Sequence, residues 1–309
     1  MNIPELVTGL SSPDRKQLAR AITMVENEME GHRELLAALR PDQKVPVIGV
    51  TGPPGAGKST LIDAMISELV RQGKKVAVIA IDPTSPFTHG SLLGDRVRMN
   101  RHFNDPNVFI RSLATRGSLG GLSAKPIEVC DVIRSAGFDL IFVETVGVGQ
   151  SEMEIAGLAD TTILVLVPES GDEVQAIKSG IMEIADIFVV NKSDREGADA
   201  FIKDLYEVAR SGKGKRFADD VSSEENTCCP VIKAVATSGE GVPEILNAIH
   251  EHSDRSVTTN RIFLLAEKAF RLIQKKRMGN IDRSDLFEKI RSGSEKRDFN
   301  LYSFVENNF

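Results

Sequence analysis

The chain has 309 residues, of which 41% are hydrophobic and 27% charged, and its formal net charge is −6. This composition is ordinary for a globular protein, and the acidic balance argues against nucleic acid as the main partner. No apolar run approaches the roughly 20 residues that span a bilayer, and the first residues resemble neither a signal nor a transit peptide. Three cysteines without C-x-x-C spacing favour a reducing compartment. We therefore expect a cytoplasmic protein without a membrane segment.

Residues 1–45 are expected to form an N-terminal helical extension, because Leu18, Ile22, Val25 and Met29 recur at helical spacing. From residue 46 onward, β-branched apolar runs alternate with helical segments. Such runs predict an α/β fold, a mainly parallel sheet flanked by helices, with ligands at the carboxyl ends of the strands. We assign residues 46–255 to this domain and 256–309 to a C-terminal helical extension. That extension either packs on the core or forms a dimer contact.

The first predicted strand, Val45–Thr51, leads into a glycine-rich loop and a helix, with the spacing G-x-x-x-x-G-K-[ST] of a phosphate-binding P-loop. Glycines let backbone N–H groups turn toward a phosphate, and the helix start adds the positive end of its dipole. Lys58 is expected to neutralise β/γ-phosphate charge and to serve catalysis, and Ser59 to ligate Mg²⁺. The nucleotide-binding loop comprises Gly52, Pro53, Pro54, Gly55, Ala56, Gly57, Lys58, Ser59 and Thr60.

Two carboxylates follow the second predicted strand. Asp82 lies at its tip and Asp95 comes thirteen residues later, and we place both at the metal or the attacking water. Turn formation and capping are the alternatives for these two residues. The segment 83–94 between them is rich in Gly, Ser, Thr and Pro, which predicts a mobile loop suited to switching on the γ-phosphate.

The strand Leu140–Val143 continues into E-T-V-G, which occupies a D-x-x-G position with Glu144 in place of Asp. Gly147 is expected to present its N–H to the γ-phosphate, and Glu144 to act near Mg²⁺ through water. Val148 stands where a water-orienting Gln would follow the glycine, and Gln150 is offset from that position. Because phosphoryl transfer depends on positioned groups, we expect slow hydrolysis unless a partner helps.

An N-K-S-D string follows the predicted strand Ile187–Val190. Asp194 can accept hydrogen bonds from the N1–H and N2 amine of guanine, which adenine does not offer. Asn191 is expected at the other base edge, with the stem of Lys192 along the ring. A helix cap is the alternative for this short string, but after a P-loop it favours GTP over ATP. The loop after the last strand is expected to make a main-chain contact to guanine O6 through Val235, Ala236 and Thr237.

Three further features carry less chemistry. The polar segment 211–229 predicts an exposed insertion, and its Cys228 and Cys229 have no histidine nearby to complete a metal site. His250 and His252 are two residues apart, so on a helix they face different ways and make a poor metal pair.

Together these strings resemble the MeaB/ArgK (MMAA-type) G-protein family, within the signal-recognition-particle/MinD/BioD (SIMIBI) class of P-loop GTPases. The resemblance runs to about residue 250 and implies a chaperone of an adenosylcobalamin-dependent acyl-CoA mutase such as methylmalonyl-CoA mutase. In that family GTP hydrolysis gates cofactor delivery and protects the mutase, which in turn stimulates hydrolysis. The matching strings are GPPGAGKST, IDPTSP…GSLLGDRVRM, RSLATRGSLGGLS, ETVGVGQSE, PESGDEVQAIKSGIMEIAD and NKSD.

The resemblance also implies roles for single residues. Asp82, Asp95 and Glu144 would serve Mg²⁺ and catalysis, and Lys178 would act from a third switch loop that responds to the mutase. Taken by itself, Lys178 would be a solvated helix residue. The chain would bind GTP, GDP and Mg²⁺, and would meet adenosylcobalamin only through the mutase. The resemblance also implies a homodimer through a C-terminal arm, although the last fifty residues match that arm less clearly than the rest of the chain matches the family.

Two other functions stay open at this point. A metallochaperone GTPase of the hydrogenase/urease nickel type would need Cys or His ligands near the switches, and the sequence offers no convincing set. A small-molecule kinase, as in the older arginine/ornithine-transport label of the family, would transfer the γ-phosphate to a metabolite, a role that N-K-S-D does not favour.

Overall fold

The computed structural model describes residues 2–12, 15–83, 96–115, 124–145, 155, 157–168, 184–211 and 229–255, and in the C-terminal part 266, 269–270, 272–274, 276–278, 281–294 and 300–308. The chain divides into two compact units, Met1–Leu265 and Ala266–Phe309. The described residues contain no helix that is both long and apolar enough to cross a bilayer.

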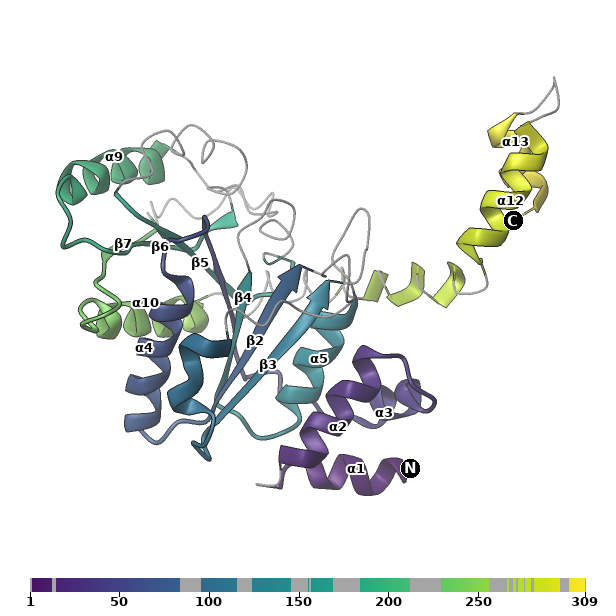
Figure 1. Cartoon of the computed structure of the whole chain (residues 1–309), viewed down its shortest axis with the longest axis horizontal. Helices are drawn as coiled ribbons and strands as arrows, with labels where there is room; N and C mark the ends of the chain where they lie inside the picture. Colours follow the sequence, from purple (N-terminus) through teal and green to yellow (C-terminus); the bar gives the residue numbers. More distant parts are fainter. Residues whose placement is uncertain are drawn as a thin grey trace. The chain divides into compact units, whose positions relative to one another are not determined.

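A seven-stranded sheet forms the centre of the first unit, with the order β3-β2-β4-β1-β5-β6-β7 among the described strands (Figure 1). Every neighbouring pair is parallel. The predicted mainly parallel α/β fold is therefore confirmed. The strands are β1 (Val47–Thr51), β2 (Val76–Pro83), β3 (Val108–Thr115), β4 (Leu140–Thr145), β5 (Thr161–Leu166), β6 (Ile187–Val190) and β7 (Val231–Lys233).

Helices cover both faces of this sheet, because the strands are apolar on both sides. One face buries residues of α4 (Lys58–Arg71), α10 (Val242–Arg255) and the 3₁₀ helix η1 (Arg96–His102). The other face carries α5 (Ala124–Arg134) and the N-terminal helices, and at β5–β7 also α9 (Ala198–Ser211). The N-terminal helices are α1 (Ile3–Leu10), α2 (Arg15–Glu26) and α3 (His32–Ala38).

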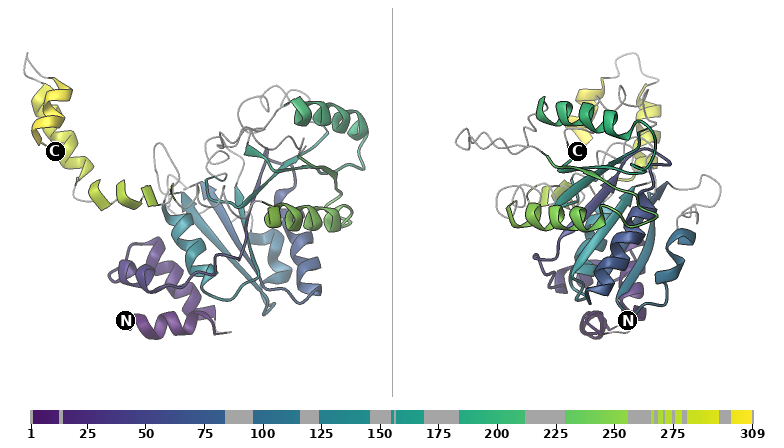
Figure 2. Two further views of the ribbon diagram at one scale, coloured as in Figure 1. Left: turned by 180° about the vertical axis from the view of Figure 1, so that it is seen from behind. Right: turned by 90° about the vertical axis from the view of Figure 1, so that its left-hand side faces the viewer.

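The N-terminal helices pack into the same core as α5 and β3, and Figure 2 shows them beside α5 in the view from behind. Leu18, Ile22 and Val25 are buried as the stripe predicted, but Met29 is 51% exposed. The difference arises because α2 ends at Glu26, so that Met29 no longer lies on the helical stripe. Ion pairs also hold this region, with Glu26 bound to Arg111 of β3 at 2.6 Å.

At the amino-terminal edge of the sheet, an aspartate directly precedes each of β4, β5 and β6. Its N–H donates to a carbonyl of the neighbouring chain segment, and its carboxylate accepts the N–H of that same residue. This reciprocal pairing satisfies backbone groups at the entry of each strand. The pairs are Asp139 with Lys75, Asp160 with Val47, and Asp186 with Thr162, with carboxylate bonds of 2.7, 2.8 and 2.8 Å.

The second unit contains α12 (Arg283–Ser294) and α13 (Leu301–Asn308). Several of its large apolar side chains are exposed. They are Phe270, Leu272, Ile273, Met278, Phe287, Leu301, Tyr302 and Val305.

Candidate functional site

The P-loop connects β1 to α4 as its spacing predicted, with Gly52, Gly55 and Gly57 all at positive φ. Two of these glycines have no room for a side chain. A Cβ on Gly52 would lie 2.1 Å from the Val165 carbonyl oxygen, and one on Gly57 would lie 2.3 Å from Asn191 Nδ2. The loop is therefore held against β5 and against the segment after β6, at the carboxyl edge of the sheet.

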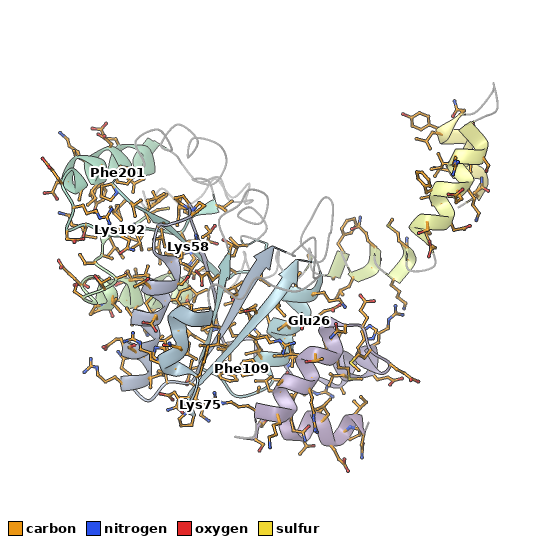
Figure 3. The ribbon with its side chains drawn as sticks, viewed as in Figure 1. Glu26, Lys58, Lys75, Phe109, Lys192 and Phe201 are labelled. Carbon is orange, nitrogen blue, oxygen red and sulfur yellow. The ribbon has the colours of Figure 1, made fainter. Side chains whose placement is uncertain are left out.

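Lys58 is the first residue of α4 and is only 6% exposed. Its ammonium donates to the carbonyl oxygens of Gly52 at 2.8 Å and Pro53 at 3.0 Å. Figure 3 shows Lys58 and Lys192 near the same end of the sheet, and Lys75 at the opposite end. The charge of Lys58 thus lies inside the loop that is expected to hold phosphate.

The hydroxyl of Ser59 donates to Glu144 Oε1 at 2.6 Å, and each of these residues is 3% exposed. The two residues come together because β1, which feeds the P-loop, pairs with β4, where Val50 is in register with Glu144. Since the Ser59 proton points to the carboxylate, the oxygen lone pairs of Ser59 remain for a cation. A hydroxyl beside a carboxylate supplies the hard oxygen ligands that Mg²⁺ prefers.

Asn191 joins two loops of the site and is 2% exposed. Its Nδ2 donates to the Ala56 carbonyl at 2.8 Å, and its Oδ1 accepts the Ala236 N–H at 3.0 Å. Sequence reasoning placed this amide at a base edge, but did not foresee the link. An amide nitrogen carries two protons, so one remains for a base and the expected contact stays a prediction.

The rest of the N-K-S-D turn is fastened to the chain after β7. Lys192 has a positive φ of 56°, and Ser193 donates both its N–H and its hydroxyl to the Ala234 carbonyl, each at 3.1 Å. Asp194 is exposed. The turn therefore presents the Asp194 carboxylate to solvent from a backbone that Ser193 ties to Ala234, and its contact with guanine stays a prediction.

The loop expected to meet guanine O6 offers fewer N–H groups than its sequence suggested. The Val235 N–H donates to the Glu240 carbonyl at 3.0 Å, and the Ala236 N–H is taken by Asn191. Within the described residues, Thr237 is the member of this trio whose N–H is not taken up. Thr237 is also exposed, which makes it the residue of the three best placed to reach a ligand.

A family model described as "Methylmalonyl Co-A mutase-associated GTPase MeaB" matches residues 18–294. The chain belongs to this family. Membership makes this MeaB-family chain a GTPase, in agreement with the strings from which its family was predicted. The mutase association belongs to the description of the family.

Individual proteins agree with this assignment. The MeaB-family chain is 45% identical to a putative GTPase of Pyrococcus abyssi, over 98% of this chain and 95% of that protein. It is 38% identical to the GTPase ArgK of Escherichia coli, over 84% and 78%. A crystal structure of a "LAO/AO transport system kinase" superposes with a TM-score of 0.65 at 26% identity and covers 99% of this chain and 97% of that one.

Other predicted site residues of the MeaB-family chain are placed only in part. Asp82 lies in β2, in register with Ala114 of β3, and its side chain lies outside the described part. Asp95, Gly147 and Lys178 lie outside the described residues, as do residues 84–94 of the expected switch segment and most of the insertion. Their roles stay predictions.

Sequence reasoning did not find a charged cluster beside the P-loop helix. Asp63, one turn beyond Ser59 in α4, accepts from Arg101 Nε at 2.9 Å and lies 3.0 Å from His102 Nε2. The cluster attaches η1 to α4. No local pattern revealed it, because the contact joins residues almost forty positions apart.

Proposed function

We propose that this MeaB-family GTPase is a chaperone of an adenosylcobalamin-dependent acyl-CoA mutase, such as methylmalonyl-CoA mutase. GTP binding and hydrolysis gate delivery of the cofactor to the mutase and protect the mutase. The observation that supports a nucleotide switch is the Ser59–Glu144 hydrogen bond, which joins the P-loop to the end of β4. The mutase as partner rests on the description of the family.

The phosphates bind at the loop Gly52–Thr60, with Lys58 as the neutralising cation. Ser59 would hold Mg²⁺ and Glu144 would act on it through water, as the sequence predicts, and Asp82 and Asp95 would complete the residues at the metal and the attacking water. Bound Mg²⁺ would supply positive charge against the anionic transition state. The chain's own part is to fix Lys58, Ser59 and Glu144 so that little reorganisation is needed when charge develops.

The base is read at the loops after β6 and β7. Asp194 accepts the two guanine donors, the free proton of Asn191 Nδ2 meets the opposite edge, and Thr237 supplies the N–H for O6. The Lys192 stem covers the ring. The fixed backbone of the N-K-S-D turn, tied to Ala234 by Ser193, supports this assignment.

Hydrolysis is slow in the isolated protein and rises with the mutase. Val148 in place of a water-orienting glutamine supports slow chemistry. The N–H of Gly147 senses the γ-phosphate, and Lys178 contributes to catalysis when the mutase is bound. The second unit forms a homodimer contact, which is supported by its exposed apolar side chains, among them Phe287 and Tyr302. The protein acts in the cytoplasm.

Steady-state release of phosphate from GTP tests the proposal, with and without an adenosylcobalamin-dependent acyl-CoA mutase from the same genome. A clear rise in the rate on adding the mutase is expected. The absence of stimulation by every such mutase of that genome would overturn the chaperone function.

A kinase reaction is the competing outcome, because the LAO/AO transport protein is described as a kinase. GTP labelled at the γ-phosphate distinguishes the two reactions. Label released as free phosphate supports the GTPase switch, whereas label transferred to a metabolite supports the kinase.

A further inference from the structure

A second contact joins β4 to the strand that carries the P-loop. Thr145 Oγ1 donates to Thr51 Oγ1 at 3.0 Å, and the two residues are 1% and 0% exposed. Thr51 is the last residue of β1 and directly precedes Gly52, whereas Thr145 is the last residue of β4 and directly follows Glu144. The hydroxyl pair therefore lies where both strands enter the functional loops.

The two contacts of β4 lie on opposite faces of the sheet. Successive residues of a strand point to opposite sides. Glu144 points with Phe142 to the face covered by α4, where Ser59 receives it. Thr145 points with Val143 to the face covered by α5 and the N-terminal helices. The end of β4 is thus attached to the P-loop region by one hydrogen bond on each face of the sheet.

The threonine pair stands out from its surroundings, because the strand residues that share its face are apolar. Val47, Ile141 and Val143 belong to the buried apolar cluster on that side. A valine has nearly the shape of threonine, so two valines would fill the same space without burying hydroxyl groups. The pair is therefore not needed for stability. A hydrogen bond is directional, however, so this bond fixes the position of one strand end relative to the other.

We propose that Thr145 is a positioning residue of the GTPase site. Its bond to Thr51 holds the end of β4 against the P-loop, and thereby keeps the Glu144 carboxylate at a set distance from the cation held by Ser59. This inference rests on the proposed binding of Mg²⁺ with GTP. Loss of the bond leaves the phosphate loop intact but lets Glu144 shift relative to Ser59, so the metal requirement changes more than the affinity for the nucleotide.

The experiment uses the full chain with Thr145→Val, Thr51→Val, the double variant and Thr145→Ser. The Mg²⁺ concentration for half-maximal GTP hydrolysis is measured at saturating GTP, and the Kd for GDP is measured in EDTA. Because a shift of a carboxylate by a fraction of an ångström weakens a metal site, each valine variant should need about 3- to 10-fold more Mg²⁺. The Kd for GDP without metal should stay within about twofold of wild type.

Two comparisons within the set separate positioning from general loss of stability. The double variant should need no more Mg²⁺ than the single variants, because both substitutions remove one shared bond. Thr145→Ser keeps the hydroxyl and should restore the wild-type requirement. If one valine variant folds poorly, the other decides the question, because Thr51→Val and Thr145→Val remove the same bond.

Thr161→Val is the matched control. Thr161 is 0% exposed and its hydroxyl lies 2.9 Å from His252 Nδ1, but it begins β5 at the opposite edge of the sheet. This variant should melt at a lower temperature without a changed Mg²⁺ requirement.

An unchanged requirement in Thr145→Val would overturn the inference, and so would an equal rise in Thr161→Val or a failure of Thr145→Ser to restore it. Wild-type protein that neither binds nor hydrolyses GTP would overturn the proposed function itself. A normal wild type with normal valine variants would overturn only the role of Thr145.

Discussion

The carboxylates at the two edges of the sheet have different hydrogen-bond partners. At the amino-terminal edge, Asp160 accepts the Val47 N–H at 2.8 Å and pairs with the buried guanidinium of Arg134 at 2.6 Å. At the carboxyl edge, Glu144 accepts a hydrogen bond from the neutral hydroxyl of Ser59, whose oxygen keeps its lone pairs. The Asp160 carboxylate satisfies a backbone N–H and a buried cation, whereas the Glu144 carboxylate lies beside a hydroxyl where a ligand can bind.

This difference separates acidic residues that hold the sheet from those that serve chemistry. A carboxylate that accepts hydrogen bonds from backbone N–H groups and pairs with a buried cation has a structural role. A carboxylate at the carboxyl ends of parallel strands, beside a hydroxyl and a glycine loop, lies where α/β proteins bind ligands. Substitutions at the two edges should therefore affect different quantities, namely stability at one edge and turnover at the other.

Replacing Lys58 by Ala should produce the largest effect. Loss of the charge inside the P-loop should lower GTP turnover by about 10³-fold, because positioned charge carries most of phosphoryl-transfer catalysis. Thermal melting should stay close to wild type. The control is Lys75→Ala at the opposite edge (Figure 3), which should leave turnover unchanged. Retained turnover in Lys58→Ala would place the phosphate site elsewhere.

Replacing Asp160 by Ala should reverse that pattern. The substitution leaves Arg134, which is 3% exposed, without its closest carboxylate. Breaking such a buried pair should cost about 3 kcal/mol of unfolding free energy, measured by urea denaturation. The turnover number per folded molecule should not change. A large loss of turnover at full stability would remove the distinction between the two edges.

Replacing Asp194 by Asn tests base recognition at the carboxyl edge. GTP binding should weaken by about tenfold or more, because a site built for the guanine donors loses its acceptor, while binding of xanthosine nucleotides is spared. Isothermal titration with both nucleotides measures the change. Asp199→Asn, at an exposed aspartate that pairs with Lys233, is the control. Unchanged guanine selectivity would contradict the assignment.

The smallest effect is expected at Glu68, on the solvent-exposed side of α4. Hydrogen bonds from Arg71 hold the pKa of the Glu68 carboxyl below its ordinary value of 4.5. A depressed pKa adds stability above the ordinary value, and this contribution disappears as the pH falls through the folded value. The melting difference between wild type and Glu68→Gln should therefore be slight near neutral pH and vanish in acid. A difference that grows in acid would contradict this ion pair.

Local features of the site were predictable from the sequence, whereas contacts between distant segments were not. The strand–loop–helix around Lys58 follows from residue spacing, because the P-loop chemistry is contained in nine consecutive residues. The meeting of Ser59 with Glu144 follows from the pattern of motifs after strands. The link from Asn191 to Ala56 spans 135 positions and depends on the order of the strands, which no local pattern records. The Thr51–Thr145 bond, across 94 positions, was missed for the same reason.

The aspartates ahead of β4, β5 and β6 also have a consequence for how the chain finds its fold. Parallel strands must align without a tight turn to set their offset, and a slip by one residue turns every side chain to the other face. Such a slip would move Asp139 or Asp186 toward rows of apolar side chains and away from the N–H groups that donate to its carboxylate, at a high desolvation cost. Each of these crossovers thus ends in a carboxylate whose hydrogen bonds form only in the native register, which disfavours misaligned strand pairing.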